Sequence, residues 1–331
     1  MALFPSKVET TGLAVIGLIC LCLSPIVVAK EPRQVSDDLG RTVLAPQKPK
    51  RIAAGADETL ATILLELQAP LIASTARVDP STGALFMKGP PSSFGVTLES
   101  AEITVVAINN RPDFEALAAA APDLIVVNQF AEPYLNQLSL VAPTFIAIET
   151  PEPWATHRSV ARALGLGEDS ERLQRHFEMR LNRARERLDL PNGTTYSAFT
   201  MNVSVDGIQV DPQTSISYIA EGLGLSPNTL MEELSSSGDR FSTRMSLERF
   251  PELDADYIFV TFREAGRQQL EEGLDRLDQA LPTWCQLLSA CREGRIIVFS
   301  DEVAVSPSFV GYSRMLDIAM SHLVSHRVRQ R

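Results

Sequence analysis

The residue types that most often carry metal or catalytic chemistry are sparse in this chain of 331 residues and lack the usual spacing. Of its four histidines, only His322 and His326 are close in sequence, and a separation of four places them on one face of a helix. That helix is expected to be terminal and exposed, so both are interpreted as surface residues. Because no histidine, aspartate and glutamate cluster has metal-ligand spacing, the sequence predicts no resident metal and no cofactor.

Sequence motifs of common enzyme sites are also missing. The chain has no Gly-x-Ser-x-Gly elbow, no phosphate-binding Gly-x-x-x-x-Gly-Lys loop and no Gly-x-Gly-x-x-Gly turn after a strand. A serine, histidine and aspartate triad is assembled by the fold, so sequence spacing alone does not reveal one. The protein is therefore predicted not to be an enzyme, with an exported α/β hydrolase kept as the alternative from another class.

Two cysteines, Cys285 and Cys291, could form a disulfide in an oxidising compartment. If residues 284–291 form one helix, a separation of six residues places the two Cα atoms about 9 Å apart. A disulfide tolerates a Cα separation of about 7 Å at most. The bond is therefore expected only if the helix unwinds before Cys291, and both states stay open from the sequence.

The first 29 residues have the pattern of an export signal. Lys7 precedes an apolar run from Gly12 to Ala29, which ends in Val27-Val28-Ala29 with small residues where signal peptidase favours them. Cleavage after Ala29 and a periplasmic location are expected. An uncleaved anchor is one alternative, and lipidation of a cysteine in the run is another, disfavoured by the bulky residue before each cysteine.

The composition is that of a folded, acidic protein. Hydrophobic residues make up 45% and charged residues 21%, and the formal net charge is −11. Such a surface repels a phosphate backbone, and no dense basic stripe offsets the repulsion, so nucleic acid is excluded as a partner.

Short apolar runs alternate with helical patterns on both sides of one long helix. That helix is expected over residues 170–188, where Leu173, Phe177, Leu181, Ala184 and Leu188 form one apolar stripe. The pattern predicts an α/β protein of two lobes, each with a mainly parallel sheet flanked by helices, bridged by the long helix. The expected divisions are a signal peptide at 1–29, an N-terminal lobe at 30–155, a helical backbone at 156–190 and a C-terminal lobe at 191–331. Strands are expected at residues 51–54, 71–74, 124–127, 144–148, 197–203, 257–260 and 295–299.

Seven short segments follow one another in a distinctive order. They are Pro49-Lys50-Arg51-Ile52, Ala121-Pro122-Asp123-Leu124-Ile125 after Glu115, Ala142-Pro143-Thr144, Ala163-Leu164-Gly165, Ser246-Leu247-Glu248, Leu253-Asp254-Ala255-Asp256-Tyr257-Ile258-Phe259-Val260, and Gly294-Arg295-Ile296 after Trp284. In this order they resemble the helical-backbone class of periplasmic binding proteins, in its ferric-siderophore, iron(III) dicitrate and cobalamin branch. The likeness covers about Val35 to Leu323.

The resemblance implies a protein, expected to be a monomer, that holds its ligand in a cleft between the lobes and delivers it to an ABC permease of the inner membrane. It also implies that one glutamate on each lobe contacts permease arginines, and the matching positions are Glu115 and Glu248. Paired charges at separated points fix orientation more than they add affinity. The alternative interpretation is two solvated glutamates in first turns of helices.

The ligand implied by the resemblance is a ferric siderophore of carboxylate, citrate or hydroxamate type, whose iron belongs to the ligand. Cobalamin or haem is the alternative ligand, and a sensor that presents its ligand to a receptor is a further alternative. Arginine binds carboxylates through paired hydrogen bonds, and ligands of such folds lie at the carboxyl ends of strands. Arg77, Arg240 and Arg263 are the strongest candidates, because an acidic protein that binds an anion needs local positive charge. The full candidate set is Arg77, Phe130, Tyr134, Trp154, Arg240, Arg244, Arg263, Phe309 and Tyr312.

Overall fold

The computed structural model describes residues 31–79, 82–108, 111–202, 208–210, 214–236, 243–263, 278–279, 281–304 and 306–329. The predicted signal peptide lies outside these ranges. Within them, no helix combines the length and the apolar character that crossing a membrane requires.

The N-terminal half is built on a sheet whose central strands are parallel, in the order β7-β6-β4-β3-β8-β9. β8 is buried on both faces along its whole length, as its run of β-branched residues predicts. Two short strands add antiparallel pairs to this sheet. β7 pairs with β6, and β5 pairs with β4. The strands are β3 (Ile52–Ala54), β4 (Leu71–Val78), β5 (Leu85–Phe86), β6 (Thr104–Ile108), β7 (Arg111–Pro112), β8 (Leu124–Val127) and β9 (Thr144–Ile146).

Helices cover both faces of this sheet, and an antiparallel hairpin of β1 (Arg33–Ser36) and β2 (Thr42–Ala45) packs beside it. One apolar layer lies between the sheet, α1 and α5, and another between the sheet, α3 and α4. The helical segments are η1 (Asp57–Ala61), α1 (Thr62–Glu66), α2 (Pro90–Phe94), α3 (Phe114–Ala120), η2 (Gln129–Tyr134), α4 (Leu135–Val141) and α5 (Ala155–Leu164).

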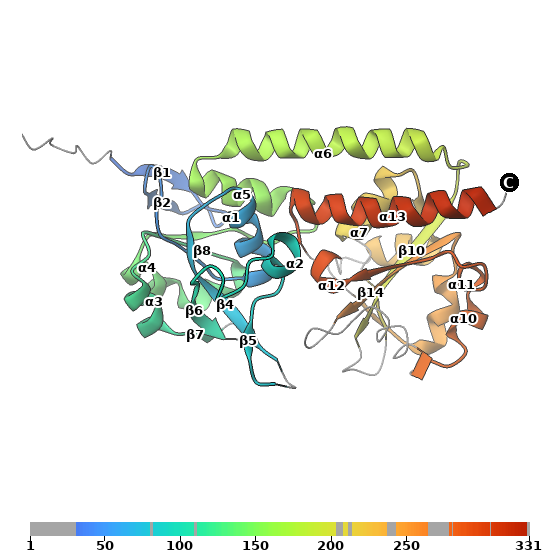
Figure 1. Cartoon of the computed structure of the whole chain (residues 1–331), viewed down its shortest axis with the longest axis horizontal. Coiled ribbons are helices and arrows are strands. Elements are labelled where there is room, and N and C mark those ends of the chain that lie inside the picture. Colours follow the sequence, from blue (N-terminus) through green and yellow to red (C-terminus); the bar gives the residue numbers. More distant parts are fainter. Residues whose placement is uncertain are drawn as a thin grey trace, which may run out of the picture. The chain divides into compact units, whose positions relative to one another are not determined.

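The long helix α6 (Gly167–Leu188) has 22 residues and starts three residues before the predicted position. Its apolar stripe is buried at Phe177, Leu181 and Leu188, and Leu173 packs against the cores of both halves of the molecule. α6 contacts α5 of the N-terminal half and α13 of the C-terminal half (Figure 1). The predicted bridging helix is therefore confirmed.

The C-terminal half has a second sheet in the order β13-β11-β10-β14-β15, with β12 paired to β10. β10, β14 and β15 are parallel, whereas β11 and β13 add an antiparallel edge. The strands are β10 (Thr195–Asn202), β11 (Ile208–Val210), β12 (Ser226–Pro227), β13 (Thr243–Met245), β14 (Tyr257–Arg263) and β15 (Ile296–Ser300). The helical segments are α7 (Ser215–Gly222), α8 (Thr229–Ser236), η3 (Leu247–Leu253), α10 (Trp284–Leu287), α11 (Ser289–Arg292), α12 (Asp301–Ala304) and α13 (Phe309–Arg329). The predicted fold class, two mainly parallel α/β lobes bridged by a helix, is confirmed.

The buried carboxylate of Glu66, at the end of α1, caps the first turn of α13. Its two oxygens accept hydrogen bonds from the backbone N–H groups of Phe309 and Val310, each at 2.8 Å. Nε2 of His157 lies 3.0 Å from the same carboxylate, and its Nδ1 lies 2.7 Å from Oγ of Ser170 on α6. Elements of both halves therefore meet at one polar group.

The region of the two cysteines differs from a single helix. Leu288 has extended backbone angles and separates α10 from α11, so the Cα atoms of Cys285 and Cys291 lie 5.0 Å apart and the cysteines form a disulfide. The break has a tertiary cause, because Oδ1 of Asp254 accepts hydrogen bonds from the backbone N–H and the hydroxyl of Ser289, at 2.8 and 3.0 Å. This contact starts a new helix at Ser289.

Candidate functional site

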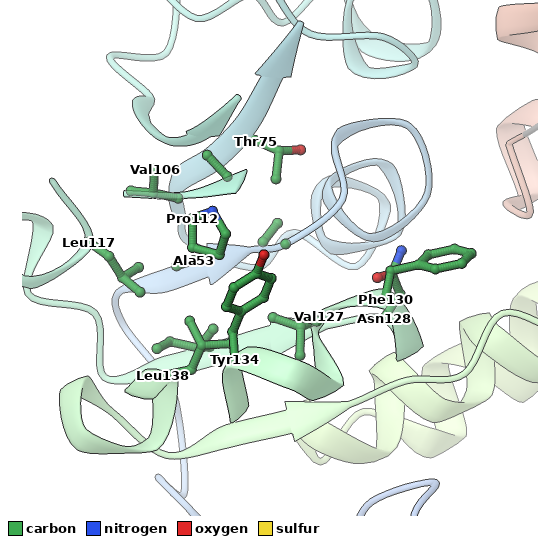
Figure 2. A pocket seen from close by; sticks show the side chains of 15 residues that line it. Ala53, Thr75, Val106, Pro112, Leu117, Val127, Asn128, Phe130, Tyr134 and Leu138 are labelled. Atoms are coloured by element: carbon green, nitrogen blue, oxygen red, sulfur yellow. The ribbon is translucent and has the colours of Figure 1, made fainter. Parts of the chain in front are cut away.

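An apolar cavity of about 40 Å³ lies at the carboxyl ends of β3 and β8. Tyr134, at the end of η2, points into it toward Ala53 and Pro112 (Figure 2). Phe130, on the same short helix, lines the cavity but points away from Tyr134, with 62% of its surface exposed. The carboxyl edge of a parallel sheet is where ligands bind in folds of this kind.

Gly55 makes the close packing at the end of β3 possible. A Cβ atom at this position would lie 2.7 Å from Cγ1 of Val127 on β8, too close for any side chain. The chain therefore turns directly over the end of β8 and enters η1, which presents Asp57, Glu58 and Thr59 at the strand ends.

Asp57 is buried and fixes the side chain of Arg77. Its carboxylate accepts hydrogen bonds from Nε and Nη2 of Arg77, at 3.1 and 3.2 Å, and from the backbone N–H of Lys88 at 2.7 Å. Nη2 of Arg77 also lies 3.0 Å from Oε2 of Glu58. Burial lowers the pKa of Arg77, but the carboxylates of Glu58 and Asp57 outweigh burial and hold that pKa above its ordinary value. Arg77 is therefore charged and doubly paired.

Glu149 follows β9 and approaches the same edge. Its Oε1 accepts hydrogen bonds from Oγ1 of Thr59 and, at 3.3 Å, from Nδ2 of Asn128, which also lines the cavity. Burial raises the pKa of Glu149 and the charge of Glu58 adds to the rise, whereas the two hydrogen bonds act in the opposite direction. Oγ1 of Thr75, another cavity residue, donates to Asp57 at 3.4 Å, so the polar groups border the apolar cavity.

The structure thus brings three predicted ligand residues, Arg77, Phe130 and Tyr134, to one sheet edge. The sequence-based candidate set did not include Asp57, Glu58, Lys88 or Glu149. Asp57 and Glu58 follow the predicted buried strand at residues 51–54 after a short turn of Gly55 and Ala56, and this position after a strand is the signal that the sequence offers. They lie in a helical first turn, where acidic residues are common for reasons unrelated to ligands.

Of three other predicted aromatic ligand residues, two lie in the core and the third packs against it. Trp154 and Tyr312 are buried, and Nε1 of Trp154 donates to the hydroxyl of Tyr218 at 3.2 Å. The hydroxyl of Tyr312 donates to the carbonyl of Pro153. Phe309 is partly buried and stacks on His176 of α6, with ring centroids 5.5 Å apart. Both Trp154 and Tyr312 pack against Phe177 of α6, with ring centroids 6.2 Å and 5.5 Å away, and their contact with a ligand stays a prediction.

Of the three C-terminal arginine candidates, Arg244 has its side chain in the described part of the structure. Arg244 is exposed on β13. Arg263 ends β14, and its side chain lies outside the described part of the structure, as does the whole of Arg240. Among the described residues, no group of three or more histidine, cysteine, aspartate or glutamate side chains gathers to hold a metal ion.

Both predicted docking glutamates are exposed in first helical turns. Glu115 lies on α3, whose N-cap Asp113 accepts a hydrogen bond from the backbone of Ala116 at 2.9 Å. Glu248 lies on η3, capped by Ser246 at 3.3 Å. The two caps fix the first turns of α3 and η3, and so the positions of the two exposed glutamates. One glutamate lies in each half of the molecule.

Solved structures of known proteins share this fold. The structure resembles Staphylococcus aureus SirA complexed with staphyloferrin B, with a TM-score of 0.67 and 17% identity over 89% of this chain and 98% of that chain. It also resembles Staphylococcus aureus FhuD2 with bound ferrioxamine B, with a TM-score of 0.66 and 17% identity over 84% of this chain and 99% of that chain.

Two relatives are similar in sequence. The ferric enterobactin-binding periplasmic protein FepB of Escherichia coli is 30% identical over 188 residues, which are 54% of this chain and 57% of FepB. The achromobactin-binding periplasmic protein of Dickeya dadantii is 27% identical over 223 residues, 64% of this chain and 69% of that protein. The match to FepB thus spans little more than half of that relative. Residues 88–303, more than half of the chain, match the family model described as periplasmic binding protein, and the chain belongs to this family.

Proposed function

We propose that this protein is the periplasmic substrate-binding component of an ABC importer, and that it captures a ferric siderophore between its lobes and delivers it to the permease. The observation that carries the proposal is the agreement of two independent comparisons. The sequence relatives are named for binding enterobactin and achromobactin, and two solved structures of the same fold hold staphyloferrin B and ferrioxamine B.

The geometry of the N-terminal half supports this function. The apolar cavity of about 40 Å³ is too small for a chelate, so the ligand lies over it at the sheet edge, beside a few fixed polar groups. Phe130 offers an exposed aromatic face beside it, and Arg77 offers a guanidinium held by Asp57. The bridging helix α6 packs on both halves and so limits their relative motion. The protein acts as a monomeric carrier without catalysis, and its iron enters and leaves with the chelator.

Calorimetric titration of the purified protein with ferric citrate, ferrichrome and ferric enterobactin tests the proposal. We expect saturable binding of at least one chelate with a micromolar or lower dissociation constant, which is about 8 kcal/mol or more of binding free energy. The metal-free chelators serve as controls and should bind at least tenfold more weakly. Absence of binding to every ferric chelate would contradict the function.

A further inference from the structure

The charges at the strand ends of the N-terminal half are balanced. Oε2 of Glu58 lies 3.0 Å from Nη2 of Arg77 and 3.4 Å from Nζ of Lys88, so one carboxylate oxygen faces both cations. Asp57 accepts hydrogen bonds from Nε and Nη2 of the same arginine. Within the part of the chain that the structure describes, the carboxylates of Asp57 and Glu58 thus face the cations of Arg77 and Lys88, although a net positive charge was expected at Arg77.

This group of four, the Glu58 cluster (Asp57, Glu58, Arg77 and Lys88), reaches the surface. The side chain of Glu58 is 26% exposed and that of Arg77 is 37% exposed, whereas the side chains of Asp57 and Lys88 are nearly buried. Glu58 follows β3, and Arg77 lies one residue before the end of β4, at the same carboxyl edge as the cavity. A ligand on this edge meets a surface with donors and acceptors but little net charge.

We infer that Glu58 is a specificity-determining residue, which cancels the positive charge of Arg77 and Lys88 and thereby favours ferric chelates of low net charge over multiply anionic ones. The inference rests on the proposed function and refines its substrate class. The ion pairs with Asp57 and Glu58 use Nε and Nη2 of Arg77, so Nη1 is not committed to them. In this arrangement Arg77 serves the ligand as a hydrogen-bond donor, such as a hydroxamate oxygen requires, and not as a source of attraction for anions.

Glu149 adds to the same effect. It is a third carboxyl group near Glu58, whose charge contributes to the raised pKa of Glu149. In its neutral form Glu149 leaves the cluster balanced, and in its ionised form it adds a negative charge. Neither form supplies the positive charge that would attract a multiply anionic ligand.

The experiment compares ferrichrome, a neutral trihydroxamate complex, with ferric enterobactin, a multiply anionic tris-catecholate. Both are titrated into the wild-type protein and into Glu58→Gln, Glu58→Asp and Glu171→Gln. Glu58→Gln keeps the shape and removes the charge, Glu58→Asp keeps the charge, and Glu171 is an exposed glutamate on α6. The readout is the ratio of the two dissociation constants, compared between variants. A contribution from the C-terminal half that is common to all variants cancels in this comparison.

We expect the wild type to prefer ferrichrome. Glu58→Gln should shift the preference toward ferric enterobactin by at least about tenfold, because two unit charges even about 12 Å apart interact by about 1.4 kcal/mol at an effective dielectric constant near 20. The shift should shrink at high salt, and Glu58→Asp and Glu171→Gln should show less than about a twofold shift. Circular dichroism and thermal unfolding of each variant confirm that the fold is retained.

A wild type that does not prefer ferrichrome overturns the inference, including the case in which neither chelate binds. An unchanged ratio in Glu58→Gln also overturns it, because the charge of Glu58 would then have no effect on selectivity. If the protein binds none of the chelates in the wider titration, the proposed function itself fails. Binding of chelates without any dependence on Glu58 leaves the function standing and removes only the inference.

Discussion

Phe130 combines a position beside the cavity with an exposed fraction of 62%, which is high for an aromatic side chain. Its removal should cost little folding free energy, within about 0.5 kcal/mol, because few contacts are lost. A ligand that stacks on the ring should instead bind about tenfold more weakly to Phe130→Ala. Calorimetry and denaturant unfolding measure the two effects, and Leu140→Ala, at an 88% exposed position on α4, is the control. Equal affinities of the wild type and Phe130→Ala would argue against a ligand contact.

The second prediction concerns pH. The folded state raises the pKa of Glu149, so the folded protein binds a proton more tightly there than the unfolded chain, whose pKa is about 4.3. The stability contributed by this proton is fully present below pH 4.3 and is lost as pH rises through the folded pKa. Glu149→Gln cannot ionise, so its stability relative to the wild type should increase between pH 4 and pH 7. Urea unfolding at several pH values measures this, with Glu132→Gln at an exposed position as the control. A constant difference across the range would show that the pKa of Glu149 is not raised.

At the residue scale, the sequence predicts where a residue lies in the fold better than it predicts what the side chain contacts. Phe130 and Tyr134 follow a predicted strand and do line the cavity. Trp154 and Tyr312 follow strands as well, but both are core residues, because the start of α13 and the middle of α6 enclose them. Whether an aromatic side chain after a strand faces a ligand or a second helix depends on the packing of distant elements, which no local pattern contains.

Among the elements, α13 depends on a residue of the other half of the molecule. Glu66 accepts hydrogen bonds from the first two N–H groups of α13, and these groups have no partner within the helix. Glu66→Gln replaces one acceptor oxygen with a donor and removes the charge. We expect a loss of about 1–3 kcal/mol of unfolding free energy and faster hydrogen exchange at Phe309 and Val310.

Chemical denaturation and exchange measured by NMR test this expectation. Glu171→Gln, on the exposed face of α6, should leave both quantities within error of the wild type. Unchanged exchange at Phe309 and Val310 in Glu66→Gln would mean that the carboxylate does not hold the helix start in solution.

The long helix and the small region around the disulfide show which elements a sequence can predict. α6 has an apolar stripe over many turns, so its pattern is strong enough to be recognised locally. The break at Leu288 instead depends on Asp254, which lies 35 residues before Ser289 and accepts hydrogen bonds from it. The helical pattern in the sequence continues through Leu288. The helix itself is interrupted there because Asp254 accepts hydrogen bonds from Ser289.

On the scale of the whole molecule, the exposed glutamates Glu115 and Glu248 lie in different halves. If they contact the permease, Glu115→Ala and Glu248→Ala should leave chelate affinity unchanged and lower uptake. The double variant should lower uptake by about tenfold or more, because charge pairs at two separated points fix the docking orientation. Uptake of a radiolabelled ferric chelate by cells measures transport, and Glu171→Ala is the matched control. Full uptake by the double variant would identify both residues as ordinary solvated glutamates.

The disulfide should make it possible to distinguish an exported molecule from a precursor that stays in the cytoplasm. The chain has four cysteines, of which Cys285 and Cys291 are paired, while Cys20 and Cys22 precede the predicted cleavage site at Ala29. Cytoplasmic thiols are kept reduced, so a precursor that stays inside should offer four groups to an alkylating reagent, and an exported, cleaved molecule should offer none. Alkylation before denaturing electrophoresis would therefore divide a cell's total pool into molecules that crossed the membrane and molecules that did not, without any fractionation of the cell.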